Sequence, residues 1–343
     1  MKLYKGNVTG KVYRLVYELN KDNRIRVRTP VGDSEVRETG ETVQQGSILG
    51  GILSSLSLGK GVEDFFSSSE WEIFYDSLKI LPLVFQDDLF RMSLDPLSAQ
   101  MGFDKFQSLA ESKVLDYNLT KTFCIIVGKR KAREKLEKDF RDNPPTLYGK
   151  EVQIVSHESY LGEELGGSIS DSITLTINKR IGLVKKAITE IKSIVEDCRS
   201  QVVGSIKTGI MLYELCVLPF LLNHASTWLQ IKQSDLKRLI KLDCLFYNSL
   251  LGVKNCPAMA LFWETGALVM PIRILKSKLL LYHHLSCLPM KSPAHQVLQI
   301  QEKLGLPSLR DEIVEFLRKF EVVEVSTFSK DGWKKFVREK STF

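Results

Sequence analysis

The sequence predicts an α+β fold in which strands come first and helices follow. Up to about residue 167, short runs of apolar residues are separated by Gly, Pro, Asn and Asp, which is typical of strands joined by tight turns. From about residue 170, apolar residues recur every three or four positions, as on the buried face of a helix. A chain of 343 residues is long enough for two or three domains, each with its own core.

Composition and charge narrow the classes of function. With 43% hydrophobic and 26% charged residues, the chain has the composition of an ordinary globular protein. Its net charge of +7 favours a phosphate-rich partner. The longest apolar run, residues 210–222, contains Glu214 and is too short to span a bilayer. The first residues lack the apolar stretch of a signal peptide. We therefore expect a cytoplasmic and/or nuclear protein with no membrane partner.

The six cysteines form no CxxC pair, and with the five histidines they give no zinc-finger spacing. Scattered single cysteines are typical of a reducing compartment. His283, His284 and Cys287 come nearest to a metal cluster. They lie in an apolar helical stretch, and we interpret them as packing residues.

The first expected elements are a helix and a strand. Residues 9–19 place their apolar side chains on one helical face. Residues 24–29 alternate basic and apolar residues, which predicts a strand with one face of three arginines, and residues 30–34 form a turn. The arginine face is either solvated or turned toward phosphate, and the residues alone favour neither.

A glycine-containing loop then opens an apolar helix. Gly46 and Ser47 end a polar loop, and the helix is expected over residues 48–58. The first-turn N–H groups of a helix are unpaired, so they can meet a phosphate or a sugar. Small residues at this point let a bulky ligand approach the backbone.

Two adjacent carboxylates form the most informative feature of the chain. The apolar run Leu81–Phe85 predicts a buried strand, Asp87 and Asp88 interrupt it, and apolar character returns over residues 89–92. This pattern predicts a β-hairpin whose turn carries both acids. Mg²⁺ prefers hard oxygen ligands and takes one or two carboxylates from protein, leaving room for phosphate oxygens. The alternative is that the pair belongs to a solvated turn.

These two stretches resemble the palm of a reverse transcriptase, most closely those of non-LTR (LINE-type) retrotransposons. In that family a Q-G-S-x-L helix precedes an F-x-D-D hairpin, and here they stand as residues 45–49 and 85–88. Gln86 occupies a position where the family more often has Ala. The resemblance implies a right-hand polymerase palm, an antiparallel sheet that carries helices.

Two further stretches resemble the next palm motifs in family order. Residues 115–128 are similar to the motif in which an Asn and a Lys-Thr pair precede a strand, and Lys121 matches its lysine. Taken by itself, Lys121 is equally well an exposed lysine in a turn. Residues 159–163, Ser-Tyr-Leu-Gly-Glu, resemble the Y-L-G hairpin that steadies the primer end.

The resemblance implies a role for each matched residue. Asp87 would be the main ligand of Mg²⁺ (or Mn²⁺) and Asp88 its neighbour in a two-metal site. Lys121 would neutralise charge on the leaving pyrophosphate, or donate a proton to it, as the P–O bond breaks. The remaining matched residues would contact nucleic acid or nucleotide: Gln45, Gly46 and Ser47 at the template or incoming nucleotide, and Tyr160, Leu161 and Gly162 at the primer.

Two helices are expected between these motifs. Residues 95–114 carry a helical pattern, and residues 129–142 form a charged helix that ends at Asn143-Pro144-Pro145. Ala132, Leu136 and Phe140 form the apolar stripe of the second helix. We interpret its basic run as a solvated face, with nucleic-acid contact as the alternative.

The rest of the chain is expected to be helical. Amphipathic helices are predicted over residues 174–195, 200–218, 233–251, 271–287 and 309–320, followed by a mobile basic end over residues 330–340. The apolar stripe of the first of these helices consists of Ile177, Ile181, Val184, Ile188, Ile191 and Val195. In the family, a helical thumb follows the palm. Residues 219–228 and 264–274 match its P-x-L-L-x-x-A-x-x-W and E-x-G-x-x-x-x-P-x-R-I patterns. We interpret Trp228 and Trp263 as core residues.

The resemblance gives a domain division and a partial palm. We expect a partial palm over residues 1–167, a helical thumb or connection region over 168–290, and a C-terminal helical segment with a basic tail over 291–343. The family's first palm motif carries another Asp upstream. Before Asp22 the only acidic residue is Glu18, so we expect a truncated palm without that motif or the fingers.

The sequence therefore predicts an RNA-directed DNA polymerase that acts on an RNA template with a DNA primer, or on an RNA–DNA hybrid, and uses deoxynucleoside triphosphates. The alternative from another class is a non-catalytic nucleic-acid-binding remnant of such a polymerase. A third class, a helical scaffold, predicts no binding to nucleic acid. The sequence gives no oligomeric state.

Overall fold

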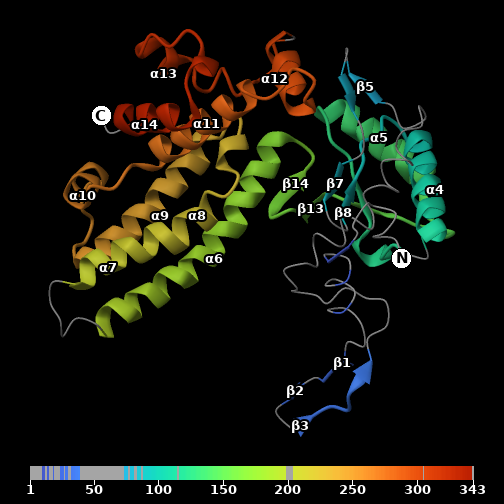
Figure 1. The fold of residues 1–343 in the computed structure, drawn as a ribbon, viewed down its shortest axis with the longest axis horizontal. Coiled ribbons are helices and arrows are strands. Elements are labelled where there is room, and N and C mark those ends of the chain that lie inside the picture. Colours follow the sequence, from blue (N-terminus) through green and yellow to red (C-terminus); the bar gives the residue numbers. More distant parts are fainter. Residues whose placement is uncertain are drawn as a thin grey trace. The chain divides into compact units, whose positions relative to one another are not determined.

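A computed structural model gives the structure, and it describes residues 88–113, 116–197, 204–303 and 305–341. Before residue 88 it also describes residues 10–11, 14, 18, 24–26, 28–29, 32–38, 73–75, 78–80 and 83–85. Figure 1 shows the elements in chain order. The chain has a mixed α+β architecture with small sheets, as predicted. It divides into two compact units, Met1–Tyr117 with Pro145–Gly149, and Asn118–Pro144 with Lys150–Phe343.

Short antiparallel ladders occupy the early part of the first unit. They are formed by β1 (Arg24–Ile25) with β4 (Arg37–Glu38), and by β2 (Arg28–Thr29) with β3 (Gly32–Asp33). The strand predicted over residues 24–29 is therefore two short strands. Its three arginines all face carboxylates: Arg24 and Glu38 at 3.4 Å, Arg26 and Asp33 at 3.7 Å, Arg28 and Asp33 at 3.4 Å. These pairs are exposed, so each contributes at most about 1 kcal/mol. The helices expected over residues 9–19 and 48–58 lie largely or wholly outside the described residues.

Two hairpins and a long helix follow in the same unit. The hairpin strands are β5 (Ile73–Tyr75) with β6 (Leu78–Ile80), and β7 (Leu83–Phe85) with β8 (Asp88–Phe90). The expected helix is α4 (Pro96–Lys113). It begins after Asp95, whose carboxylate accepts a hydrogen bond from Ser98 N at 2.7 Å and so satisfies a free first-turn donor. Gln100 in α4 holds Thr146 of β10 (Thr146–Leu147) by accepting from its N–H at 2.6 Å and donating to its carbonyl at 3.0 Å.

The second unit begins with two parallel strands joined through a helix. These are β9 (Phe123–Ile125), α5 (Arg130–Asp142) and β12 (Gln153–Val155), and β11 (Lys150–Glu151) precedes β12. Parallel strands need such a crossover connection. The predicted charged helix is confirmed and ends one residue before Asn143, ahead of the two prolines. Its apolar stripe is only partly buried, because Phe140 lies in the core whereas Ala132 is exposed.

The helical region has two hydrophobic cores. Its elements are α6 (Ile169–Asp197), α7 (Gly204–Leu212), the π-helical turn η4 (Tyr213–Val217), α8 (Leu218–Leu221), α9 (Gln233–Leu251), α10 (Ala258–Thr265), α11 (Met270–Ser286), α12 (Pro293–Lys303), α13 (Val314–Lys319), η6 (Val325–Thr327) and α14 (Lys330–Lys340). The first core joins α6, α8, α9 and α10, and it contains all six residues of the predicted α6 stripe: Ile177, Ile181, Val184, Ile188, Ile191 and Val195. The pattern in the sequence therefore predicted the buried face of α6 correctly.

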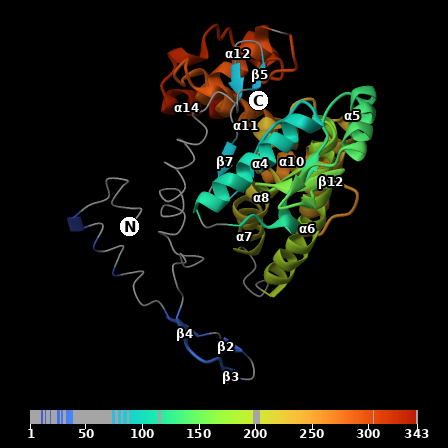
Figure 2. The same cartoon turned by 90° about the vertical axis from the view of Figure 1, so that its right-hand side faces the viewer.

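Two predictions about residues 309–320 and 330–340 are wrong, in the region of the second hydrophobic core. Residues 330–340 were expected to be mobile, but they form α14, which lies beside α11 in both views (Figures 1 and 2). Trp333 is fully buried, donates to Leu279 O at 2.9 Å and stacks on His283. The helix predicted over residues 309–320 is shortened to α13. Ser308 and Asp311 explain this, because the carboxylate of Asp311 accepts from both Ser308 N–H and its hydroxyl in a local turn.

The burial of Trp263 also differs from the prediction, which placed this residue in the core. It is 89% exposed, whereas Trp228 is 1% exposed, as predicted. In the short helix α10, Leu261 and Phe262 take the buried positions, so Trp263 faces outward.

Within the described ranges, no single helix is long and apolar enough to cross a membrane. Helices α10 and α11 reach that length and composition only when taken together, and this pair is bent by 62°.

A buried carboxylate in the first core makes stability depend on pH. Asp243 is fully buried, Tyr213 OH donates to its Oδ1 at 2.6 Å, and its Oδ2 has no hydrogen-bond partner among the described residues. Burial raises the pKa of Asp243 from 3.8 to about 6, against the hydrogen bond from Tyr213, which lowers it. The folded state therefore favours the protonated acid, and stability is lost as pH rises from about 4 to about 6.

We expect Asp243→Asn to remove this pH dependence. Between pH 4 and pH 7, the wild-type free energy of unfolding should fall relative to that of the variant by about 2 kcal/mol. Urea unfolding at pH 4, 5, 6 and 7 measures the difference. Parallel curves for the two proteins would show that Asp243 titrates alike in the folded and unfolded chains.

Candidate functional site

The acidic hairpin is present where the sequence predicted it. In the β7–β8 ladder, Asp88 pairs with Phe85 and Leu89 pairs with Val84. Opposite residues of an antiparallel ladder share a face, so the Asp88 side chain lies on the face of Phe85. Leu89 lies on the other face and packs against Phe106 and the other apolar residues near α4. Asp88 is exposed, and it is the first residue of β8 rather than a turn residue.

Two apolar side chains of β7, Leu83 and Phe85, are exposed, which corrects the prediction of a buried strand at these two residues. Leu83 is 58% exposed and Phe85 is 52% exposed. In the described part of the chain, β7 has only β8 as a neighbour. A two-stranded ladder buries a face only where another element covers it, and here that covered face is the one carrying Leu89.

Several predicted residues lie outside the described part of the chain. These are Gln45, Gly46 and Ser47, together with Asp87. The expectation that Gln45 and Asp87 face a common groove stays a prediction. In the part of the chain that the structure describes, no group of three His, Cys, Asp or Glu side chains is placed to hold a metal ion.

Lys121 ends a short 3₁₀ turn that leads into a strand. The turn is η2 (Leu119–Lys121), and β9 begins two residues later. Asn118 caps the turn, because its Oδ1 accepts from Thr120 N at 3.0 Å. Lys121 is exposed. Its position agrees with both interpretations from the sequence, a lysine that meets phosphate and a solvated lysine.

The Y-L-G stretch forms the expected hairpin. Its strands are β13 (His157–Tyr160) and β14 (Glu163–Gly166), and Tyr160 pairs with Glu163 across a two-residue turn. Leu161 and Gly162 have positive φ angles, 49° and 82°, as in the tight turns that match the twist of two strands. Both turn residues are exposed, and Tyr160 is half-buried. The structure thus brings the three predicted primer-binding residues together at one hairpin tip.

The positive φ at the second position of the turn favours glycine. A Cβ at Gly162 would meet no atom within 4 Å, so its cost is purely one of backbone strain. We expect Gly162→Ala to destabilise the second unit by about 1–2 kcal/mol.

Gly182→Ala is a matched control, for which the opposite change in stability is expected. It lies within α6, a Cβ there also meets nothing within 4 Å, and its φ is not positive. Gly182→Ala should stabilise the chain by about 0.5–1 kcal/mol because alanine loses less backbone entropy in a helix. Urea unfolding of both variants tests the pair, and equal changes would contradict the strained-turn account.

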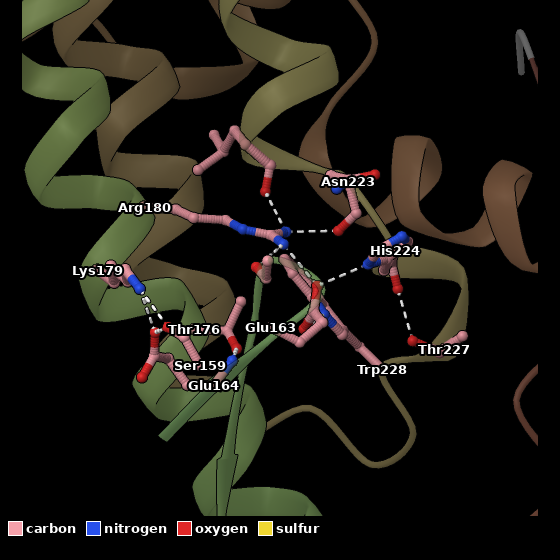
Figure 3. Close-up of polar contacts among 12 residues, drawn as sticks. Ser159, Glu163, Glu164, Thr176, Lys179, Arg180, Asn223, His224, Thr227 and Trp228 are labelled. Atoms are coloured by element: carbon pink, nitrogen blue, oxygen red, sulfur yellow. Dashed lines mark hydrogen bonds and ion pairs between the residues drawn. The ribbon is translucent and has the colours of Figure 1, made fainter. Parts of the chain in front are cut away.

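A buried arginine holds the hairpin tip (Figure 3). Arg180 of α6 is 4% exposed. Its Nη2 donates to Gly162 O at 2.9 Å and to Glu163 Oε1 at 2.5 Å. Its Nη1 donates to Asn223 O and, at 3.4 Å, to Leu221 O. One guanidinium therefore joins the turn of the hairpin to the end of α8.

Glu163 extends this contact to the tryptophan of the predicted thumb pattern. Trp228 Nε1 donates to Glu163 Oε2 at 3.4 Å, and the Arg180 guanidinium lies 5.7 Å from the Trp228 ring centre. Trp228 follows the short turn η5 (Ala225–Thr227), and His224 Nδ1 before it lies 3.3 Å from Glu163 Oε1. Two stretches that the sequence matched separately are therefore in contact.

Another polar cluster lies on the other side of the hairpin (Figure 3). Lys179 Nζ lies 2.5 Å from both Glu164 Oε1 and Ser159 Oγ, and Ser159 also donates to Glu164. Burial raises the pKa of Glu164, but the hydrogen bonds from Lys179 and Ser159 and the positive charges nearby outweigh it, so the net pKa is lowered. Its carboxylate therefore stabilises the fold above its unfolded-state pKa, and this contribution is lost in acid.

The sequence did not predict the contact of Arg180 with the hairpin tip, because an arginine next to Lys179 in an amphipathic helix predicts a solvated pair. The signal that could have pointed toward it is Glu163, a partly buried acid directly after the turn that needs a cation. Asp88 belongs to the first unit, whereas Lys121 and the hairpin tip belong to the second.

Comparison with known proteins assigns no family to the chain. No protein-family model matches the chain, and a search of curated proteins gives no significant match.

Proposed function

We propose that the chain is the RNA-directed DNA polymerase of a non-LTR retrotransposon, in the form of a partial palm followed by a helical thumb-like region. Its partners are an RNA template with a DNA primer, or an RNA–DNA hybrid, and deoxynucleoside triphosphates. One observation carries the proposal. The Y-L-G stretch is a hairpin with an exposed two-residue tip, and a buried arginine donates a hydrogen bond to the tip. A rigid, exposed tip of this kind is suited to steadying a primer end.

The exposed residues fit the expected chemistry. The primer 3′-hydroxyl attacks the α-phosphate of the incoming nucleotide, and catalysis is mostly positioning and charge neutralisation. Asp88 offers an exposed carboxylate, the type of oxygen ligand that Mg²⁺ or Mn²⁺ prefers, and Asp87 is its proposed partner. When bound, the metal supplies positive charge to the phosphate oxygens. Lys121 presents an exposed ammonium suited to the departing pyrophosphate.

Primer extension on poly(rA)/oligo(dT) with the full chain, Mg²⁺ and dTTP tests the proposal. We expect labelled primer to lengthen with time, and extension to need both the template and the metal. The absence of extension with Mg²⁺ and with Mn²⁺ would exclude the polymerase activity of this chain.

The chain's excess positive charge favours one second candidate, a remnant that binds nucleic acid without extending it. Binding of a fluorescent RNA–DNA hybrid, measured from 50 to 300 mM salt, identifies it. Phosphate contacts make the affinity fall steeply with salt. Binding without extension supports the remnant, and no binding at low salt supports a helical scaffold.

A further inference from the structure

The hairpin that carries the Y-L-G tip is bonded to helix α6 along its outer edge. Glu164 N donates to Thr176 Oγ1 at 2.8 Å, and Gly166 N donates to Ser172 Oγ at 2.8 Å. These are alternate residues of β14, whose N–H groups point away from β13. Two hydroxyls of α6 thus take the place of a third strand, and the edge of the hairpin is fixed to the helix.

Arg180 fixes the tip in addition to the edge. We propose that Arg180 is the positioning residue of the primer-binding turn, and that through it the hairpin moves as one body with α6 and the segment from α8 to Trp228. This inference deepens the proposed function and rests on it.

The geometry explains why the residue is an arginine. The two Nη atoms of a planar guanidinium diverge, so one serves Gly162 O and Glu163 while the other serves the carbonyls of Leu221 and Asn223. A lysine has a single nitrogen and cannot hold both sides in a fixed plane. The bond to Gly162 O fixes the peptide plane that follows the exposed turn residues Leu161 and Gly162.

The hairpin tip also lies in the same compact unit as the helices that hold it. The palm and the helical region were expected to meet at residues 167 and 168. In the structure, the hairpin at residues 157–166 and helix α6 belong to one compact unit, Asn118–Pro144 with Lys150–Phe343, while Asp88 belongs to the other. The proposed primer-binding tip is therefore expected to move together with α6 and the helices bonded to it.

Arg180→Lys in the full chain tests the proposal with two measurements. The first is the KM for primer and the kcat of extension, and the second is hydrogen exchange of the amides of Leu161, Gly162 and Glu163. We expect the KM for primer to rise about tenfold with kcat nearly unchanged, since a misplaced tip weakens primer positioning. Exchange at the three amides should become several times faster.

Arg273→Lys is the matched control. Arg273 is also a largely buried arginine that bonds a carbonyl, Leu268 O at 2.6 Å, and a carboxylate, Glu214 at 3.3 Å. It should change neither the KM for primer nor exchange at the tip. Unchanged KM and exchange in folded Arg180→Lys would overturn the proposal, as would equal effects of the two variants.

The two readouts separate this inference from the proposed function. If the wild-type chain extends no primer and binds no hybrid, the proposed function fails, and exchange at the tip alone decides whether Arg180 positions the turn. If Arg180→Lys does not fold, Glu163→Gln replaces it, because it keeps the side-chain size and removes the charged acceptor. The same changes are expected, and their absence would again overturn the proposal.

Discussion

Replacing Asp87 by alanine is expected to lower primer extension by about a thousandfold while leaving hybrid binding intact. Nucleotidyl transfer depends on positive charge held at the phosphate oxygens, and the acidic hairpin is the proposed place where that charge is held. Removing the carboxylate removes the metal ligand. It does not remove the basic groups that bind the nucleic acid backbone, so affinity for the hybrid should stay the same or rise slightly.

Asp142→Ala is the control for this substitution. Asp142 is an exposed acid at the end of α5, and nothing connects it with the proposed chemistry. It should extend primers at the wild-type rate. Normal extension by Asp87→Ala would remove the acidic hairpin from the mechanism. Loss of both extension and binding in that variant would point to unfolding, which circular dichroism detects.

The sequence predicted local structure well because local structure depends on spacing. A period near 3.6 fixed the buried face of α6, and its six stripe residues are all in the core. A hairpin at Asp87 and Asp88 was predicted from the interruption of an apolar run, and a second at residues 159–163 from the resemblance to the Y-L-G motif. Both hairpins are present, although Asp88 is a strand residue rather than a turn residue. The boundaries of α4, α5 and α11 differ from the predicted ones by at most one residue at each end, and those of α9 are identical to the prediction.

Burial was predicted less well, because spacing shows which residues share a face but not what covers that face. Phe85 and Leu83 were expected in a buried strand and are exposed on a two-stranded ladder. Trp333 was expected in a mobile end, yet it fills the second core because α11 offers it an apolar face and a carbonyl acceptor. Such partners lie about 50 residues apart in sequence, and no local pattern indicates them.

At the candidate site too, the sequence predicted what depends on neighbouring residues but not the contacts between residues far apart in the chain. The hairpin tip was predicted from a short motif, since its residues are neighbours in sequence. Arg180 was not predicted, because its partners Gly162 and Asn223 are 18 and 43 residues away. Trp228 was assigned to the core correctly, but its contact with Glu163 needed the fold.

Trp228→Ala is expected to lower the free energy of unfolding of the second unit by about 3–5 kcal/mol. The indole is almost wholly buried in the first core, so its removal leaves a cavity. It also takes the N–H donor from Glu163 and the aromatic face from Arg180. A domain of this kind has about 5–15 kcal/mol of stability in total, so the loss should be plain in urea unfolding followed by circular dichroism.

Trp263→Ala and Trp228→Phe show which part of the effect comes from which contact. Trp263 is the exposed tryptophan of α10, so the same truncation there should change stability by less than about 0.5 kcal/mol. Trp228→Phe keeps an aromatic ring in the core but loses the N–H donor, and it should cost about 1–2 kcal/mol. Because Glu163 also bonds Arg180, this variant should speed hydrogen exchange at Gly162 in the turn more than at amides of the first core. Equal losses in Trp228→Ala and Trp263→Ala would contradict the burial on which both the core and the hairpin anchor depend.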